Sequence, residues 1–314
     1  DASHAMHVFD FGQIIAGVCR LRIRGRRGQR VTLKFGEVLN TDGTVYRENL
    51  RTARATDTYI CRGGGVEEWT PRFTFHGFRY VEVTGLERKP SPSLLAALVL
   101  HTDMRATGEF RCSSRLLNRL DQNIRWGQRG NFLEIPTDCP QRDERLGWTG
   151  DAQVFIGTAA FHYDVRGIFR KWLQDLRDCQ DGHGAYPDFA PYLKNVWSPG
   201  QYGNAAWADA GVICPWQIYR HYGDREILEE NYGVMVRWIE YQRRTSNGLL
   251  RPRTAYGDWL AIDAVTPQGA PVPSDLVGTA YFAHTAGIVA LVAKVLGKKS
   301  DERRYRALRG RIIE

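Results

Sequence analysis

The sequence predicts a multidomain chain, in which an all-β sandwich over residues 1–103 precedes an all-α domain over residues 104–314. In the first part, short runs alternate apolar with polar residues and are separated by turn signals such as TDGT and RGGG, a pattern typical of a sandwich. Beyond residue 113 the apolar residues recur at helical spacing instead. With 314 residues, 43% of them hydrophobic and 25% charged, the composition is that of an ordinary globular protein.

Each element can be placed along the chain in order. The alternating runs predict strands at residues 18–25, 30–39, 55–63, 79–85 and 95–104. The helical spacing predicts helices at residues 113–130, 150–163, 165–180, 205–223, 224–244, 278–297 and 300–314. Two joints between helices, residues 181–204 and 253–278, are long and rich in Gly, Pro and Trp. Long loops in a helical domain usually carry function.

Charge and cysteine content exclude several classes of partner. The net charge of +8 would permit nucleic-acid binding, but the arginines are spread along the chain, so we expect no nucleic-acid partner. The apolar run YFAHTAGIVALVAKVLG is interrupted by His284 and Lys294 and predicts a buried core helix rather than a membrane span. The six cysteines show neither a CxxC pair nor metal-ligand spacing, so we expect reduced thiols, a cytoplasmic or otherwise reducing location, no metal and no cofactor.

Residues 136–153, PTDCPQRDERLGWTGDAQ, concentrate four carboxylates, two arginines and a tryptophan. A solvated, salt-bridged turn before a helix is one interpretation. The charges, however, are interleaved with residues that bend and bury a chain, among them Pro136, Cys139 and Trp148. Carboxylates held near a buried aromatic ring have altered pKa values, which favours a functional site. Cys139 has no nearby histidine in the sequence and is expected to pack rather than to act as a nucleophile.

The long loops pair Asp with Trp or Tyr, as the charged stretch does. Sugars suit this pairing, because their hydroxyls need polar partners and their C–H faces need aromatic platforms. Trp148, Trp207 and Trp259 lie at helix entrances or in loops, where core packing and sugar contact are equally reasonable interpretations. Tryptophans within the predicted helices are expected to pack in the core; these are Trp126, Trp172, Trp216 and Trp238.

The stretch IPTDCPQRDERLGWTGDAQVF resembles the signature of bacterial α-L-rhamnosidases, the family-78 glycoside hydrolases. The likeness extends over nearly the whole chain. FDFGQIIAGVCRLRIRG, FGEVLNTDGTVYRENLRTARATDTY and PRFTFHGFRYVEVTGL resemble the β-sandwich that precedes the catalytic domain of that family. AAWADAGVICPWQIYRHYGD and YGDWLAID resemble later segments of its catalytic domain.

The resemblance implies an (α/α)₆ barrel that hydrolyses terminal α-L-rhamnose with inversion at the anomeric carbon. It implies that Glu144 is the general acid, and the adjacent Asp143 stays open as an alternative. It further implies that Asp138, Arg142 and Asp151 bind rhamnose hydroxyls. It also implies that Trp148 forms a wall of the pocket and that Trp207 and Trp259 contact the sugar. The expected partners are rhamnose-containing glycosides or oligosaccharides.

Inversion also needs a second carboxylate roughly 6.5–9.5 Å from the first. In the family this base is a glutamate well downstream, expected beyond Glu314, and seven helices are too few for a twelve-helix barrel. We therefore expect an incomplete barrel that self-associates and is inactive by itself, unless Asp209, Asp258 or Asp263 serves as the base. A carbohydrate-binding protein without catalysis and another glycan-active enzyme on the same barrel are the alternative functions.

Overall fold

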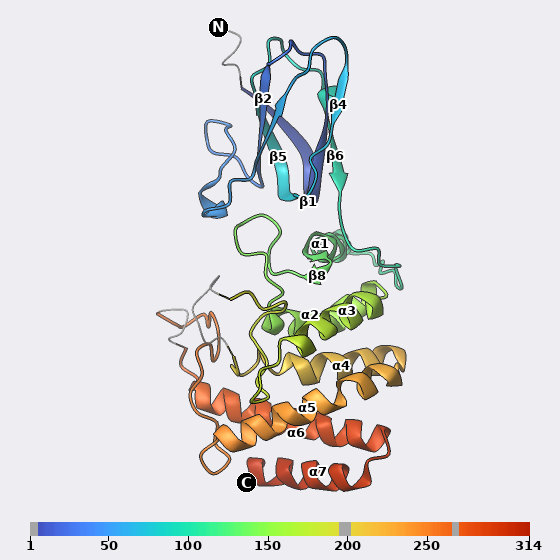
Figure 1. Ribbon diagram of the computed structural model, residues 1–314, viewed down its shortest axis with the longest axis vertical. Coiled ribbons are helices and arrows are strands. Elements are labelled where there is room, and N and C mark those ends of the chain that lie inside the picture. Colours follow the sequence, from blue (N-terminus) through green and yellow to red (C-terminus); the bar gives the residue numbers. More distant parts are fainter. Residues whose placement is uncertain (1–5, 195–201, 266–269) are drawn as a thin grey trace. The chain divides into compact units, whose positions relative to one another are not determined.

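A computed structural model describes residues 6–194, 202–265 and 270–314 of the chain (Figure 1). The chain forms two compact units, each described here by itself. The β unit comprises Asp1–Asp103 and Phe110–Arg145, and the helical unit comprises Met104–Glu109 and Leu146–Glu314. The domain boundary predicted between residues 103 and 104 stays a prediction.

The described part of the β unit contains one six-stranded antiparallel sheet with the order β3-β2-β5-β1-β4, in which β6 also pairs with β1. Strand β1 pairs with β5 on both sides of a register shift between Asp10 and Ile15, beside Gly12 at φ 81°, and its later residues pair with β6 and β4. The predicted all-β domain is thus confirmed as a curled sheet. Its strands are β1 (His7–Ile23), β2 (Arg30–Gly36), β3 (Thr56–Ile60), β4 (Glu67–Trp69), β5 (His76–Thr84) and β6 (Leu95–Val99).

Alternation along the strands builds the core of the β unit. On β2, Val31, Leu33 and Phe35 are completely buried, whereas the residues between them are partly exposed. Helix α1 (Arg115–Asn131) begins at Ser114, whose hydroxyl accepts a hydrogen bond from the backbone N–H of Leu117, and its Trp126 packs against the same core. The expected core role of this tryptophan is confirmed. Two short strands follow α1, β7 (Phe132–Leu133) and β8 (Ile135–Pro136).

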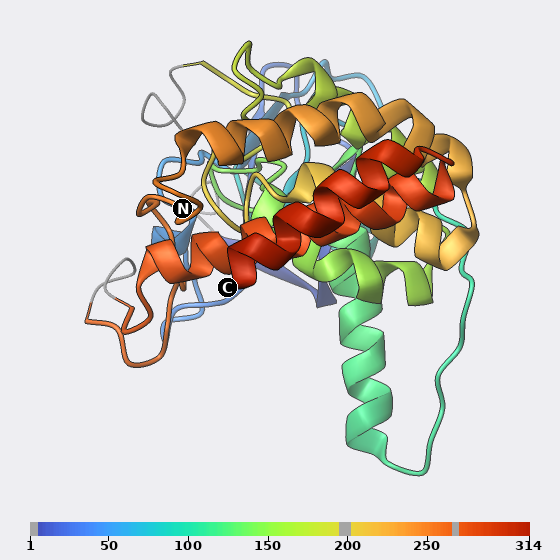
Figure 2. The same cartoon turned by 90° about the horizontal axis from the view of Figure 1, so that it is seen from below.

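Six α-helices form the described part of the helical unit and, with α1, confirm the seven that the sequence predicts. Figure 1 shows α4, α5, α6 and α7 as successive layers, and Figure 2 shows α6 and α7 running side by side. Helix α4 begins five residues later than predicted, because residues 205–209 form a turn before it. The helices are α2 (Thr149–His162), α3 (Arg166–Asp178), α4 (Ala210–Tyr222), α5 (Arg225–Thr245), α6 (Ser274–Val295) and α7 (Lys299–Ile313).

Helix α6 is the one helix among the described residues that is long and apolar enough to cross a membrane. Half of its most apolar stretch is buried within the protein, and the helix packs against α5 and α7. Phe282, Val289 and Ala293 on its inner face are completely buried. These contacts are those of a core helix. Length and apolar composition alone do not distinguish a core helix from a membrane span.

Candidate active site

The charged stretch begins on a scaffold at the end of α1. The backbone N–H and the hydroxyl of Thr137 both donate to the carbonyl of Asn131, at 2.9 and 2.8 Å, which closes the β7–β8 hairpin and fixes where the next residues start. The side chains of Asp138 and Glu144 are only 8% and 14% exposed, and Cys139 is buried. Buried and half-buried charges at these positions contradict the interpretation of the stretch as a solvated turn.

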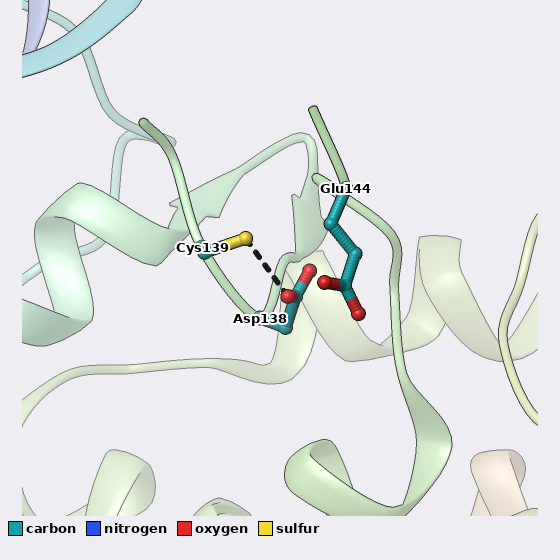
Figure 3. A group of neighbouring side chains, drawn as sticks. All are labelled: Asp138, Cys139 and Glu144. Atoms are coloured by element: carbon teal, nitrogen blue, oxygen red, sulfur yellow. Dashed lines mark hydrogen bonds between the residues drawn. The ribbon is translucent and has the colours of Figure 1, made fainter. Parts of the chain in front are cut away.

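Asp138, Cys139 and Glu144 form a compact group in which the two carboxylates face each other (Figure 3). The Cys139 thiol donates a hydrogen bond to Oδ2 of Asp138 at 2.8 Å. Burial, together with this hydrogen bond, raises the pKa of Cys139 to about 11. One donor atom from each residue lies within 4.8 Å of the others, which is close enough for a shared metal ion. Because the thiol donates its hydrogen bond to Asp138, we interpret the group as a hydrogen-bonded support for that carboxylate.

Arg142 links the members of this group. Its Nη2 lies 3.1 Å from Oε2 of Glu144 and 3.4 Å from Oδ2 of Asp138, and its Nε donates to the Cys139 sulfur at 3.2 Å. One guanidinium therefore sets the spacing between two carboxylates. The structure brings together the three residues that the sequence predicts here, and Cys139, which was expected only to pack, also forms hydrogen bonds with Asp138 and Arg142.

Two residues that the sequence analysis missed reach the same stretch from the loop between β2 and β3. Nε of Arg51 lies 2.9 Å from Oδ1 of Asp143, and its Nη2 donates to Oε2 of Glu144. Thr52 donates to Oδ2 of Asp143 through both its hydroxyl and its backbone N–H. These hydrogen bonds, with the charge of Arg51, hold the pKa of Asp143 below its usual value. Asp143 therefore remains a carboxylate in the neutral range.

Three predicted tryptophans meet in the helical unit around Tyr256. The ring centroid of Tyr256 lies 6.3 Å from that of Trp148, 4.3 Å from that of Trp207 and 5.4 Å from that of Trp259. Trp148 immediately precedes α2, Trp207 lies in the turn before α4, and Trp259, which is 38% exposed, lies in the loop before α6. We call these four rings the aromatic cluster. Its members are at least partly accessible, which distinguishes them from core tryptophans.

The remaining tryptophans divide differently. Trp172 and Trp238 are completely buried, as predicted. Trp216, in the middle of α4, is only half-buried and stacks on Tyr219 with a centroid separation of 5.4 Å, so it does not pack fully in the core as predicted. Trp197, in the long loop of residues 181–204, lies outside the described residues.

A buried carboxyl, Asp188, lies beside the aromatic cluster. Its backbone carbonyl accepts hydrogen bonds from the N–H and the hydroxyl of Thr149, which anchors the first residue of α2. Its Oδ2 accepts from the Asn204 amide at 2.7 Å, whereas its Oδ1 makes no hydrogen bond of normal geometry with any described residue. Burial raises the pKa of Asp188 to about 6, and the Asn204 amide and, to a smaller extent, the Tyr256 hydroxyl oppose that rise.

The other predicted acids occupy varied environments. Asp151 is exposed, although it lies on the first turn of α2, whose other residues are buried. Asp209 is completely buried and accepts from the Ala206 N–H and the Trp238 indole, so it has no room for a water molecule to activate. Asp258 and Asp263 are exposed, and Asp258 lines a cavity of about 240 Å³ together with Tyr256.

Comparison with known proteins places both parts of the chain. Residues 1–101 match the family described as the bacterial alpha-L-rhamnosidase concanavalin-like domain, and residues 105–314 match the bacterial alpha-L-rhamnosidase 6 hairpin glycosidase domain. An alpha-L-rhamnosidase of Streptomyces avermitilis is 50% identical over 93% of the chain, and one of Formosa agariphila is 42% identical over 96%. The chain spans 27% and 32% of the lengths of these two relatives.

Solved structures agree with the sequence matches. The crystal structure of the Streptomyces avermitilis alpha-L-rhamnosidase complexed with L-rhamnose superimposes with a TM-score of 0.91 at 49% identity, covering 98% of this chain and 29% of that one. The alpha-L-rhamnosidase from Dictyoglumus thermophilum superimposes with a TM-score of 0.92 at 38% identity, covering 98% of this chain and 34% of that one. These matches confirm the predicted fold class, a β domain followed by the helices of a hairpin glycosidase domain.

Proposed function

Because this chain belongs to the bacterial alpha-L-rhamnosidase family, we propose that it contributes the general acid of an enzyme that hydrolyses terminal α-L-rhamnose from rhamnosides. The observation that carries the proposal is the match, at 49% identity and over 98% of this chain, to a structure solved with L-rhamnose bound. The cluster of Asp138, Arg142 and Glu144 supports the proposal, because glycoside hydrolysis requires carboxyl groups that are held in fixed positions.

We assign the general acid to Glu144 rather than to Asp143. An acid catalyst must carry a proton before it can give one to the leaving group. Asp143 is held in its ionised form by Thr52 and Arg51, so it is unsuited to that role. Glu144 faces Asp138 (Figure 3), and it is the glutamate to which the resemblance of the charged stretch assigns the role of the acid. The proposed mechanism inverts the anomeric configuration, and we assign no base among the described residues, since Asp209 is fully buried.

The proposal also assigns the sugar contacts. Asp138, Arg142 and Asp151 would accept and donate hydrogen bonds to rhamnose hydroxyls, and the aromatic cluster would offer a platform for its apolar face. Partly exposed rings that meet at one place support this assignment, because rings that serve only the core would be fully covered. The expected substrates are rhamnose-containing glycosides and oligosaccharides.

The function is tested by assaying the complete gene product against p-nitrophenyl α-L-rhamnoside, α-L-fucoside and α-D-mannoside, with the released sugar identified by NMR. We expect hydrolysis of the rhamnoside alone and β-L-rhamnose as the first anomer formed. Binding of rhamnose without hydrolysis would instead identify a carbohydrate-binding protein. Release of a different sugar would identify another glycan-active enzyme.

A further inference from the structure

The loop between β2 and β3 is constructed to present Arg51. It contains one turn of 3-10 helix, η2 (Glu48–Leu50), whose Leu50 is buried and anchors the turn in the β unit. The Arg47 guanidinium donates to the backbone carbonyl of Arg54 and so closes the loop on itself. Arg51 ends the turn with φ 55°, a left-handed conformation that a residue with a side chain rarely adopts. Such conformations persist where the surroundings impose them, and they are concentrated at functional sites.

The contacts of this loop converge on the proposed acid and its neighbour. Arg51 bridges two consecutive carboxylates, with Nε on Asp143 and Nη2 on Glu144, while Thr52 binds Asp143 a second time. Arg142 contacts the same Oε2 atom of Glu144 from within its own loop. Glu144 is therefore held between two guanidinium groups. Arg51 lies 93 residues before it in the sequence, and Arg142 lies two residues before it.

We propose that Arg51 is a positioning residue for catalysis, which orients the Glu144 carboxyl toward the leaving-group oxygen and locks the adjacent Asp143 in place. The inference rests on the proposed function. It assigns a catalytic contribution to the loop between β2 and β3, which lies outside the charged stretch that carries Glu144. A planar guanidinium suits this task, because it presents several donors at fixed angles and can bind two carboxylates at once, which a lysine ammonium cannot do with the same geometry.

Leaving-group dependence separates positioning of an acid from general support of the fold. Proton donation matters most when the leaving group is poor, so an ill-placed acid slows hydrolysis of alkyl rhamnosides and rhamnosyl disaccharides far more than that of activated aryl rhamnosides. A misplacement of about 1 Å can cost on the order of 10²-fold in rate. For Arg51→Ala we therefore expect kcat on a rhamnosyl disaccharide to fall on the order of 10²-fold and kcat on p-nitrophenyl rhamnoside to fall much less.

The experiment compares Arg51→Ala, Arg51→Lys and Arg54→Ala in the complete gene product, each at its own pH optimum. Arg54 is the matched control, because it lies in the same loop and its side chain makes no hydrogen bond or ion pair with the described residues. We expect Arg54→Ala to match the parent, Arg51→Lys to recover only part of the disaccharide activity, and added guanidinium ion to restore part of the activity of Arg51→Ala.

Each outcome has a defined meaning. A parent enzyme that releases no rhamnose overturns the proposed function and, with it, this inference. A parent that is active, beside an Arg51→Ala variant that loses activity equally on both substrates or on neither, overturns the inference alone. If Arg51→Ala fails to fold, the same comparison is made with Arg51→Lys, where an equal loss on both substrates again overturns the positioning role.

Discussion

At the scale of single residues, Asp188 and Asp209 are two buried carboxyls that differ in their hydrogen bonds. Burial raises the pKa of each to about 6. Both oxygens of Asp209 accept from donors, the Ala206 N–H and the Trp238 indole, whereas only one oxygen of Asp188 is bonded, to Asn204. A raised folded-state pKa means that the charged form is disfavoured in the folded protein. Stability is then lost as pH rises from the unfolded value near 4 through the folded value near 6.

We predict that Asp188→Asn removes this pH dependence. The free energy of unfolding of the variant, relative to the parent, should rise by on the order of 3 kcal/mol between pH 4 and pH 7, as measured by denaturant unfolding at both values. Asp209→Asn should be less stable than the parent at pH 7, where the parent carboxyl is mostly ionised, because one of its two donors would face an amide N–H₂. If the free energies of unfolding of Asp188→Asn and the parent differ by the same amount at pH 4 and at pH 7, the account of Asp188 is contradicted.

The residues predicted from the sequence are those that share a short stretch or a recognisable composition. Asp138, Arg142 and Glu144 lie in one motif, and the structure places them in contact. Arg51 was missed because its partner Glu144 lies 93 residues away, and an arginine in a loop of a basic protein carries no signal of its own. Tyr256 was noted only as part of a loop composition, since nothing in the sequence places it at the centre of three tryptophans.

At the scale of elements, the entrance of α2 depends on a glycine. A Cβ atom added at Gly150 would lie 2.8 Å from the Trp207 ring, whereas one added at Gly157 in the same helix would meet nothing within 4 Å. Gly150 therefore lets the turn before α4 pack its indole directly on α2. The side chain of Trp207 is part of the aromatic cluster, so the helix backbone itself helps to set the proposed sugar platform.

Gly150→Ala should displace Trp207 and weaken rhamnose binding, whereas Gly157→Ala should leave binding unchanged and stabilise α2 by about 0.5–1 kcal/mol. Isothermal titration with L-rhamnose and thermal unfolding measure the two effects. Equal rhamnose affinities in the two variants would show that the contact between Gly150 and Trp207 does not shape the site.

The predicted elements agree with the structure where the hydrophobic periodicity extends over several turns. All seven helices were found, because each shows several turns of amphipathic or apolar spacing. The start of α4 was misplaced, because Ala205, Ala206 and Trp207 read as helix formers while the Asp209 carboxylate binds the Ala206 N–H and holds a turn. Strand β4, with three residues, is too short for an alternating pattern to reveal.

At the scale of the whole molecule, binding and catalysis should be separable. A ligand that binds only the folded state stabilises it, by about 2.7 kcal/mol at a hundredfold excess over Kd. L-rhamnose should therefore raise the Tm of the complete protein. The shift should persist in Glu144→Gln and largely disappear in Trp148→Ala, while Trp216→Ala, which alters a tryptophan outside the aromatic cluster, should keep it. If L-rhamnose raises the Tm of Trp148→Ala as much as that of the parent, Trp148 is not part of the sugar platform.

The assignment of Glu144 as the general acid is tested most directly by the leaving-group dependence of Glu144→Gln in the complete gene product, with Asp143→Asn as the control. The account predicts that Glu144→Gln lowers kcat on a rhamnosyl disaccharide by on the order of 10²–10⁴-fold and lowers it far less on an activated aryl rhamnoside. Asp143→Asn should affect both substrates to a similar, smaller extent. Unchanged kinetics of Glu144→Gln on both substrates, or the selective loss in Asp143→Asn instead, would contradict it.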